Sequence, residues 1–312
     1  MNPQVGACAV VVVTHNRMQL LQRCLWAVLG QTRSVDLVVV VDNASDDATD
    51  TLFQDGPFAA DARLDYLRLA DNRGGAGGFH AGMVRALERG ADWIWAMDDD
   101  ACPDTDALEA LLRANPRANA IYGAAALVAD GAGDELVWPV EDLGAPRPGQ
   151  TLIRRVDLPK VPVAVANVPF LGLLIHRSLI ERIGLPDKGF FVSGDDAELC
   201  ARARAAGAQV FLVPTAMIRH PRVARVWLRL GKRRMSVLRL VPWRSYYDVR
   251  NRLIIARRYF GLRLWTEVLP GTLLRWLVTL AVQPHRLSQS WAYLRGTWDG
   301  LAGRTGVRWP PP

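Results

Sequence analysis

The chain has 312 residues, of which half are hydrophobic and 22% are charged, so it is long enough to bury a large core and too apolar to be disordered. Its four cysteines lie far apart without a CxxC pair, which excludes a disulfide scaffold or a zinc ribbon and is typical of a reducing compartment. Because no charged start precedes an apolar core at the N-terminus, we expect no signal peptide and a cytoplasmic location.

Charge divides the chain into two unequal parts. Residues 1–201 contain 17 Lys and Arg against 28 Asp and Glu, whereas residues 202–312 contain 21 against 3. The second part also holds 7 of the 11 tryptophans. We therefore expect two roles in one chain, with a catalytic domain over residues 1–222 and a helical, basic, Trp-rich region over residues 223–312.

Apolar runs alternate with helical spacing through the first part. This pattern predicts strands over 7–13, 35–41, 64–69 and 93–97, and helices over 18–29, 80–89 and 105–113. Further along it predicts an irregular segment over 130–162, a strand over 170–175, a helix over 195–206 and a strand over 209–213. Alternating strands and helices favour an α/β fold with a largely parallel central sheet.

Polar clusters follow the first four predicted strands. They are Thr14-His15-Asn16-Arg17, Asp42-Asn43-Ala44-Ser45, Asp71-Asn72-Arg73-Gly74 with the glycines after it, and Asp98-Asp99-Asp100. All of them fall at the carboxyl ends of strands, which is the edge where open α/β sheets bind ligands. The sequence therefore predicts one ligand site at this edge.

The three successive carboxylates would repel one another unless a cation neutralised them. Asp98 and Asp100 alternate to the same side of an extended chain, and their oxygens suit Mg²⁺ or Mn²⁺. The alternative is a solvated acidic loop or a helix N-cap. Asp42 is placed to bind a ribose hydroxyl or a nucleobase, with an Asx-turn as the alternative.

The segment from Asn72 to Gly78 lacks the GxGxxG spacing of a dinucleotide-binding enzyme. Its glycines still allow a close approach of backbone to a ligand, and the helix that follows favours an anion at its N-terminus. The alternative is a flexible turn. Later in the chain, the adjacent carboxylates Asp195 and Asp196 supply either a general base or an N-cap pair.

Together these motifs resemble those of family 2 inverting glycosyltransferases, whose nucleotide-sugar domain has the GT-A fold. The matching segments are 11–17, 41–46, 98–100 and 194–199, and segment 72–79 is similar to the bacterial galactofuranosyltransferase and rhamnosyltransferase branch. The resemblance spans residues 7–222. The chain departs from it at Ser193-Gly194, where related galactofuranosyltransferases have Trp before the two aspartates, and this difference bears on sugar and acceptor preference.

The resemblance implies transfer of galactofuranose or rhamnose from a nucleotide-diphosphate sugar to a glycan or a polyprenyl-diphosphate-linked acceptor, in cell-envelope glycan synthesis. It implies Asp196 as the catalytic base with Asp195 beside it, and a Mn²⁺ or Mg²⁺ ion held by Asp98, Asp100 and His220. The nucleotide-sugar contacts that it implies are Thr14, Asn16, Asp42, Asn72, Gly75, Gly77, Asp98 and Asp99.

Segment 246–251 also resembles one that follows the catalytic domain in this branch. Tyr247 is a candidate for stacking on a sugar and Arg250 for meeting a phosphate, and the alternative is a helix that docks its Tyr face on the core. The apolar stretch over 262–282 is interrupted by charges, Pro270 and Gly271, so it predicts an amphipathic helix at the inner face of the membrane. The alternative is packing on the catalytic domain or an oligomer.

Two other functions compete with sugar transfer. The basic second part is compatible with nucleic-acid binding, but the acidic first part and the three aspartates argue against it, so we expect no nucleic-acid partner. A metal-dependent nucleotidyltransferase also needs paired carboxylates and a metal. It would release pyrophosphate, whereas a glycosyltransferase releases a nucleoside diphosphate.

Overall fold

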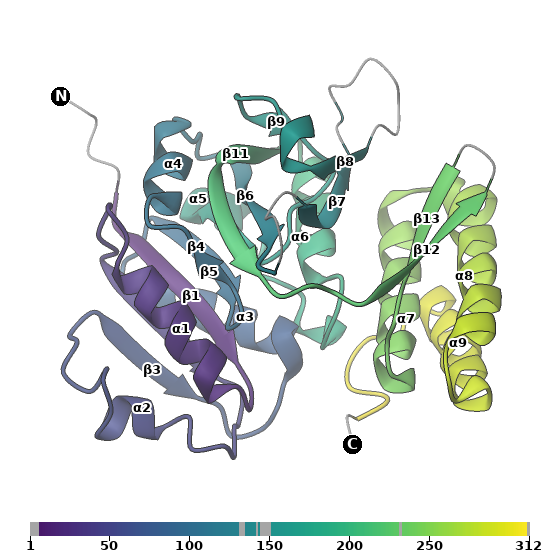
Figure 1. The fold of residues 1–312 in the computed structure, drawn as a ribbon, viewed down its shortest axis with the longest axis horizontal. Helices are drawn as coiled ribbons and strands as arrows, with labels where there is room; N and C mark the ends of the chain where they lie inside the picture. Colours follow the sequence, from purple (N-terminus) through teal and green to yellow (C-terminus); the bar gives the residue numbers. More distant parts are fainter. Residues whose placement is uncertain (1–5, 131–134, 142, 144–150, 231–232, 311–312) are drawn as a thin grey trace.

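The computed structural model describes residues 6–130, 135–141, 143, 151–230 and 233–310 (Figure 1). The strands of the main sheet are β1 (Cys8–Thr14), β2 (Leu37–Asp42), β3 (Leu64–Arg68), β4 (Trp93–Asp98), β5 (Cys102–Pro103), β6 (Ala120–Val128), β7 (Glu135–Glu141), β8 (Thr151–Arg154), β9 (Val163–Ala164), β10 (Leu171–His176) and β11 (Gln209–His220). The helices around them are α1 (Met18–Leu29), α2 (Thr51–Gln54), α3 (Gly74–Glu88), α4 (Ala107–Arg113), α5 (Arg177–Ile183) and α6 (Asp195–Ala205), with 3₁₀ turns at Arg155–Asp157 and Lys188–Phe190.

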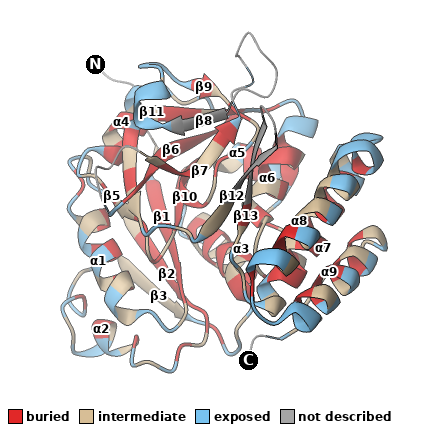
Figure 2. Ribbon diagram, turned by 45° about the vertical axis from the view of Figure 1, so that its right-hand side comes forward, coloured by how far each residue is buried: buried red, intermediate tan, exposed pale blue. Residues whose placement is uncertain are grey.

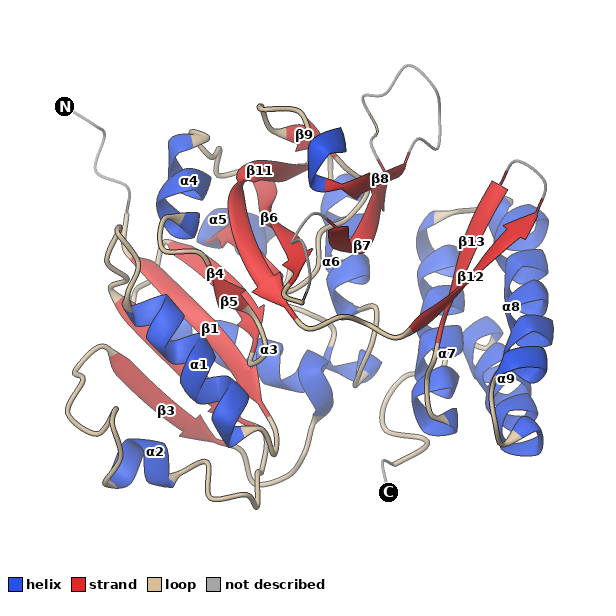
Figure 3. Ribbon diagram, in the orientation of Figure 1, coloured by secondary structure: helices blue, strands red, loops and turns tan. Residues whose placement is uncertain are grey.

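Within the described residues, eleven strands form one sheet with the order β3-β2-β1-β4-β10-β6-β11-β5, to which β7, β8 and β9 are attached (Figure 3). Strands β3, β2, β1 and β4 run parallel, and so do β6 and β11, whereas β10 runs antiparallel to its neighbours β4 and β6. The expected α/β class with a mostly parallel central sheet is confirmed.

The sheet is buried on both faces because alternate residues of its strands meet different helices. Val11 and Val13 of β1 face the cluster that contains Met83 of α3. Val10 and Val12 face the cluster that contains α1. Continuous apolar runs are what a parallel strand covered on both faces requires.

Helix α3 begins at Gly74, six residues before the predicted start at residue 80, so the glycines form the first turns of the helix and the alternative of a flexible turn is wrong. The glycines let the helix approach the sheet closely. A methyl group on Gly78 would lie 2.4 Å from Val13, and one on Gly82 would lie 2.4 Å from Val11. This packing offsets the low helix propensity of glycine.

Three other expectations about the sheet need correction. The segment over 130–162, predicted as irregular, contributes β7 and β8 within its described residues. Strand β6 was not predicted, because its Ala-rich sequence shows no strand period, yet all nine of its residues are buried. Strand β11 continues past Val213 to His220, so His220 lies at the end of a strand.

The last part of the chain adds a two-stranded hairpin and three helices. Their bounds are β12 (Arg225–Leu230), β13 (Arg233–Leu238), α7 (Pro242–Tyr259), a π-helical turn (Leu264–Val268), α8 (Leu269–Val282) and α9 (Arg286–Leu301). The region is therefore helical as expected, but it opens with a hairpin. Helix α7 packs against α6, and exposed positions run along α8 and α9 (Figure 2). Among the described residues, no helix is long and apolar enough to cross a membrane.

Candidate active site

The carboxyl edge of the sheet gathers the predicted residues because the strand register aligns them. Thr14 is the register partner of Asp42, and Val13 is the partner of Asp98. Three polar segments from separate parts of the chain therefore meet at one edge, as the sequence predicts.

The central aspartates are held by hydroxyl and guanidinium donors. Asp99 is buried and accepts hydrogen bonds from Thr14 Oγ1 at 2.8 Å and from Arg17 Nη1 at 3.1 Å. Arg17 Nη1 also lies 2.9 Å from Asp100 Oδ2. Arg17 thus offsets part of the repulsion between the aspartates, and the Thr14 hydroxyl is engaged in a hydrogen bond to Asp99.

Asp100 and His220 come together although 120 positions separate them in the chain. His220 Nε2 lies 3.1 Å from Asp100 Oδ1, a buried oxygen with no hydrogen bond. Although burial alone would raise it, His220 and Arg17 hold the pKa of the Asp100 carboxyl below its usual range. Burial, followed by the charges of Asp100 and Asp99, raises the pKa of Asp98 well above its usual range.

The donor set of this cluster fits a divalent cation. Carboxylates are hard ligands and imidazole is a borderline one, and the buried Asp100 Oδ1 has His220 Nε2 3.1 Å away. No group of three or more such side chains is close enough to hold an ion among the residues that the structure describes. Of the three predicted metal ligands, Asp100 and His220 are therefore in contact with each other, and Asp98 does not join them in a three-residue group.

The loops after β1 and β2 are tied to each other. Asn16 N donates to Ser45 Oγ, and Asn16 Oδ1 accepts from Asp46 N. Asp42 is fully buried, with Oδ1 accepting from Ser45 N at 2.8 Å and Oδ2 from the Tyr66 hydroxyl at 2.5 Å. Both carboxylate oxygens of Asp42 are therefore occupied by hydrogen bonds within the protein, one of them to the loop that follows β2. A direct ligand contact by Asp42 stays a prediction.

The start of α3 packs under the loop that leads to α6. Asn72 Oδ1 accepts from Gly74 N, and Gly74 has φ +68° with its Cα facing the Phe191 carbonyl, where a methyl group would lie 2.0 Å away. Gly77 is covered by the side chain of Arg73, whereas Gly75 has open space around it. Of the two predicted glycines, Gly75 is the one that a ligand can approach.

The two carboxylates at the start of α6 share one environment. Asp195 is buried and Asp196 is half-buried, and both lie in the first turn of the helix after Gly194, which has φ +80°. Burial raises the pKa of Asp196 to about 6. Burial and the adjacent Asp196 raise the pKa of Asp195 to about 7, and the charge of Asp195 in turn reaches Asp98.

Tyr247 and Arg250 do not face a substrate, so that expectation is corrected. Arg250 is fully buried and donates to the main-chain carbonyls of Gly189, Phe190 and Gly306. The Tyr247 side chain is also fully buried, and its hydroxyl donates to the carbonyl of Trp309. The structure has the alternative arrangement, in which α7 docks its Tyr face on the core.

Sequence reasoning missed three polar residues at this edge. Arg17 was noted only as part of a polar cluster, and its ion pairs depend on tertiary contacts. Arg244 of α7 lies within electrostatic reach of the same cluster: burial, followed by the charge of Arg17, lowers the pKa of Arg244, while Asp100 and Asp98 oppose that shift. Asn251 Nδ2 donates to the carbonyls of Phe190, Val192 and Ser193, and so holds the loop that leads to Asp195.

A central α/β sheet with carboxylates at the ends of its parallel strands, and a further pair opening a helix beside them, defines a glycosyltransferase domain of the GT-A type. Solved structures share this fold. They include GalNAc-T7 with UDP, GalNAc and Mn²⁺, with a TM-score of 0.60 and 14% identity over 93% of this chain and 55% of that one. A second is TarS 1–349 of S. aureus, with a TM-score of 0.57 and 12% identity over 93% of this chain and 81% of that one.

Residues 9–170 match the model of Glycosyl transferase family 2, and the chain belongs to this family. It is 35% identical over 220 residues to the galactofuranosyltransferase GlfT1 of Mycolicibacterium smegmatis, covering 69% of this chain and 70% of that protein. It is 23% identical over 285 residues to the dTDP-rhamnosyl transferase RfbF of Shigella flexneri, covering 86% of this chain and 87% of that protein. The chain is therefore a glycosyltransferase.

Proposed function

We propose that this glycosyltransferase moves galactofuranose or rhamnose from a nucleotide-diphosphate sugar to a hydroxyl of a polyprenyl-diphosphate-linked glycan or a polysaccharide, in cell-envelope glycan synthesis. The similarity to a galactofuranosyltransferase and a rhamnosyl transferase supports this choice of sugars. The single observation that carries the chemistry is the pair Asp195 and Asp196, with raised pKa values, near the acidic cluster of the same sheet edge.

The reaction is a single displacement. The acceptor oxygen bonds to the anomeric carbon while the bond from that carbon to the diphosphate oxygen breaks, and the anomeric configuration inverts. Asp196 accepts the proton of the acceptor hydroxyl, since it is the less buried of the two carboxylates. Arg17 and Arg244 lie beside Asp100 and stabilise the negative charge of the departing nucleoside diphosphate.

We assign the donor to the open edge near Gly75 and the loops after β1 and β2. Gly75 has the space for a close approach of backbone to the donor, and α3 starts there with its N-terminal amides. Thr14, Asn16, Asp42 and Asn72 shape this edge through their hydrogen bonds to Asp99, Asp46, Ser45 and Gly74. A divalent cation held by Asp100 and His220, with Asp98 nearby, would neutralise the donor diphosphate.

The division of roles follows the charge. Residues 1–222 carry the catalytic edge, and residues 223–312 serve the acceptor and the membrane. Helix α9 presents a stripe at helical spacing, in which Leu287 is 88% and Trp298 66% exposed, with Trp291 and Leu294 between them. Leu273 and Leu277 extend the exposed apolar surface on α8. Such a surface beside basic residues suits the interface of an anionic membrane, so we place the protein at the cytoplasmic face of the cell membrane.

A donor screen tests this function. The purified protein is mixed with Mn²⁺ and a series of nucleotide sugars, and its melting temperature and its release of nucleoside diphosphate are measured. One nucleotide-galactofuranose or nucleotide-rhamnose should raise the melting temperature and support release that depends on an acceptor. Release of pyrophosphate would instead identify a nucleotidyltransferase and contradict the proposal.

A further inference from the structure

A cavity of about 230 Å³ lies in the C-terminal region, outside the catalytic edge. Its wall is formed by Trp138 of β7, Leu238 at the end of β13, Arg252 of α7, Arg275 of α8 and Tyr293 of α9. Five elements thus enclose one space. None of its lining residues belongs to the cluster of aspartates described above.

The cavity holds more positive than negative charge. Arg225, Arg252 and Arg275 line it against the single carboxylate of Asp248. Arg252 Nη2 pairs with Asp248 Oδ2 at 2.6 Å, but Arg252 Nη1 is buried without a hydrogen-bond partner. The Arg252 guanidinium, followed by burial, lowers the pKa of Arg275 to about 10, so these two like charges face each other.

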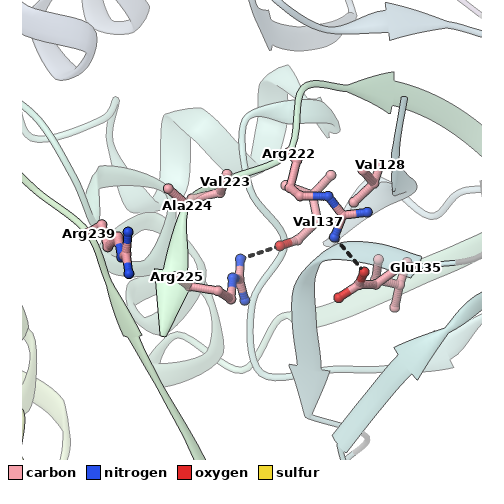
Figure 4. Close-up of a pocket in the computed structure, with 9 residues that line it drawn as sticks. Val128, Glu135, Val137, Arg222, Val223, Ala224, Arg225 and Arg239 are labelled. Atoms are coloured by element: carbon pink, nitrogen blue, oxygen red, sulfur yellow. Dashed lines mark hydrogen bonds and ion pairs between the residues drawn. The ribbon is translucent and has the colours of Figure 1, made fainter. Parts of the chain in front are cut away.

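A second hollow of about 270 Å³ adjoins this cavity (Figure 4). Arg222, Arg225 and Arg239 line it, and Arg222 pairs with Glu135 at 2.8 Å. Arg225 lines both spaces, so a basic wall runs along the hairpin side of the molecule. It starts two residues after His220 of the catalytic edge.

We propose that the cavity between Arg225, Arg252 and Arg275 binds the diphosphate of the lipid-linked acceptor, an inference that rests on the proposed function. Guanidinium groups bind phosphate oxygens in a forked geometry, and the buried Arg252 Nη1 is a donor that lacks an acceptor. An anion between Arg252 and Arg275 would also remove the repulsion of these two groups. A diphosphate can place an oxygen on each of Arg252 and Arg275 at the same time.

Position and lining favour a lipid-linked diphosphate over a free one. Ser245 of α7 lines the cavity, and the preceding residue of the same helix, Arg244, is within electrostatic reach of Asp98 and Asp100 at the donor edge. Its apolar wall of Trp138, Val237, Leu238 and Leu240 suits the first carbons of a lipid chain. Helix α8 supplies Arg275 to the cavity and carries the exposed Leu273 and Leu277, so one helix joins the cavity to the apolar surface.

The first test uses inorganic pyrophosphate as the probe on the full-length protein, with nucleoside diphosphate present in saturating amount to fill the donor site. Arg252→Gln and Arg275→Gln are compared with the wild type and with Arg286→Gln, which removes an exposed arginine of α9. We expect calorimetry to show at least tenfold weaker pyrophosphate binding in the first two variants and unchanged binding in Arg286→Gln. Equal binding in all four proteins would overturn the proposal.

The second test separates the acceptor from other phosphate sources. Two acceptors with the same terminal sugar are compared, one linked to a lipid diphosphate and one an uncharged alkyl glycoside. The KM of the diphosphate-linked acceptor divided by the KM of the alkyl glycoside should be at least tenfold higher in Arg275→Gln than in the wild type. If that ratio is unchanged while flotation on phosphatidylglycerol vesicles is lost, the cavity binds a lipid headgroup and the proposal is wrong. Arg275→Lys, which keeps the charge, should restore part of the difference.

Failure of the proposed function is distinguishable from failure of this inference. A wild-type protein that turns over no nucleotide sugar refutes the function, while the pyrophosphate titration still tests the cavity. Melting temperatures exclude misfolding as a cause. Because Arg275 is repelled by Arg252, Arg275→Gln should melt no lower than the wild type in anion-free buffer. Pyrophosphate should raise the melting temperature of the wild type and of Arg286→Gln, but not that of Arg275→Gln.

Discussion

The catalytic edge and the α7 interface both concentrate charge, but they use it in opposite ways. At the interface, Arg250 and Asn251 are buried and their donors meet main-chain carbonyls of 189–193 and of Gly306. At the edge, Asp98 is held at a raised pKa, and Asp100 Oδ1 has no hydrogen bond. Polar groups whose hydrogen bonds are satisfied within the protein stabilise the fold, whereas buried groups with unsatisfied hydrogen bonds or shifted pKa values mark the place where a ligand acts.

The two regions are also coupled through one loop. Asn251 donates hydrogen bonds to the carbonyls of Val192 and Ser193, which are separated from the catalytic pair by Gly194 alone. Phe191 and Ser193 have φ values of +64° and +68°, so this loop is in a backbone conformation that needs external support. The C-terminal region therefore supports the loop that positions Asp195 and Asp196.

The comparison predicts its largest effect for the carboxylate of Asp196 at the catalytic edge. Asp196→Asn should reduce kcat by about 10²–10⁴-fold, because it removes the base that accepts the acceptor proton. Donor affinity, measured by calorimetric titration, should stay within a factor of about three, since Asp196 faces the acceptor. An inactive Asp195→Asn beside an active Asp196→Asn would show that the base is Asp195.

The next effect concerns the cation. Removal of divalent metal with EDTA should abolish transfer, and Mn²⁺ should restore it. His220→Asn should raise the Mn²⁺ concentration needed for half-maximal activity by about tenfold or more, because one of the two preassembled ligands is lost. Undiminished turnover in EDTA would show that Arg17 and Arg244 suffice for the leaving group.

For the α7 interface, whose polar groups are hydrogen-bonded within the protein, we expect a change in the free energy of unfolding. Arg250→Met removes three hydrogen bonds to the main-chain carbonyls of Gly189, Phe190 and Gly306, so the free energy of unfolding should fall by about 2–5 kcal/mol. Arg286→Gln, at an exposed site, should change it by less than about 0.5 kcal/mol. A normal denaturation curve for Arg250→Met with a raised acceptor KM would instead place Arg250 at the substrate.

The raised pKa values of the carboxylate pair predict a pH dependence of both rate and stability. Below pH 6 the Asp196 carboxyl is protonated and accepts no proton, so kcat/KM should fall about tenfold per pH unit. The folded protein binds these protons more tightly than the unfolded chain, so the associated stability is present below about pH 4 and is lost as pH rises through 6 to 7.

That loss gives the control for the pH experiment. Asp195→Asn cannot ionise, so it should raise the melting temperature at pH 8 more than at pH 5. A rate that is flat between pH 5 and pH 8 would exclude Asp196 as the titrating base.

The smallest effect is expected for the apolar surface of α8 and α9. Leu277→Ser with Trp291→Ser should reduce flotation on anionic vesicles by about fivefold, since less apolar area enters the interface. Transfer to a short alkyl glycoside should be unchanged, because both residues lie on the exposed side. If flotation is unaffected and the oligomeric state changes, this surface joins copies of the chain.

Local sequence signals were enough for the parts of the site that come from strand ends. Asp98, Asp99 and Asp100 follow a buried strand, and their position at the sheet edge follows from the α/β pattern. The pairing of Asp100 with His220 could be expected only through the family resemblance, since 120 residues separate the two. The start of helix α3 was predicted too far along the chain, because glycine has a low helix propensity. The close approach of Gly78 to Val13, which the sequence does not reveal, explains why glycine occurs there.

The contacts between the two regions could not be predicted from the sequence. Arg244, Arg250 and Asn251 lie within one helix turn or two of each other, yet one faces the acidic cluster and two face the loop at 189–193. Their roles depend on how α7 docks, and no periodicity encodes that. The same limit concealed the cavity of Arg252 and Arg275, which exists only where three helices and a hairpin meet.

Analysis of the reaction products tests the central claim most directly. The protein, with Mn²⁺, the nucleotide sugar found in the donor screen and an acceptor glycoside, is followed by ¹H and ³¹P nuclear magnetic resonance. We predict a nucleoside diphosphate and a new glycoside whose anomeric configuration is opposite to that of the donor, with both products lost in Asp196→Asn. A product with the configuration of the donor, or pyrophosphate in the phosphorus spectrum, would contradict a single displacement assisted by Asp196.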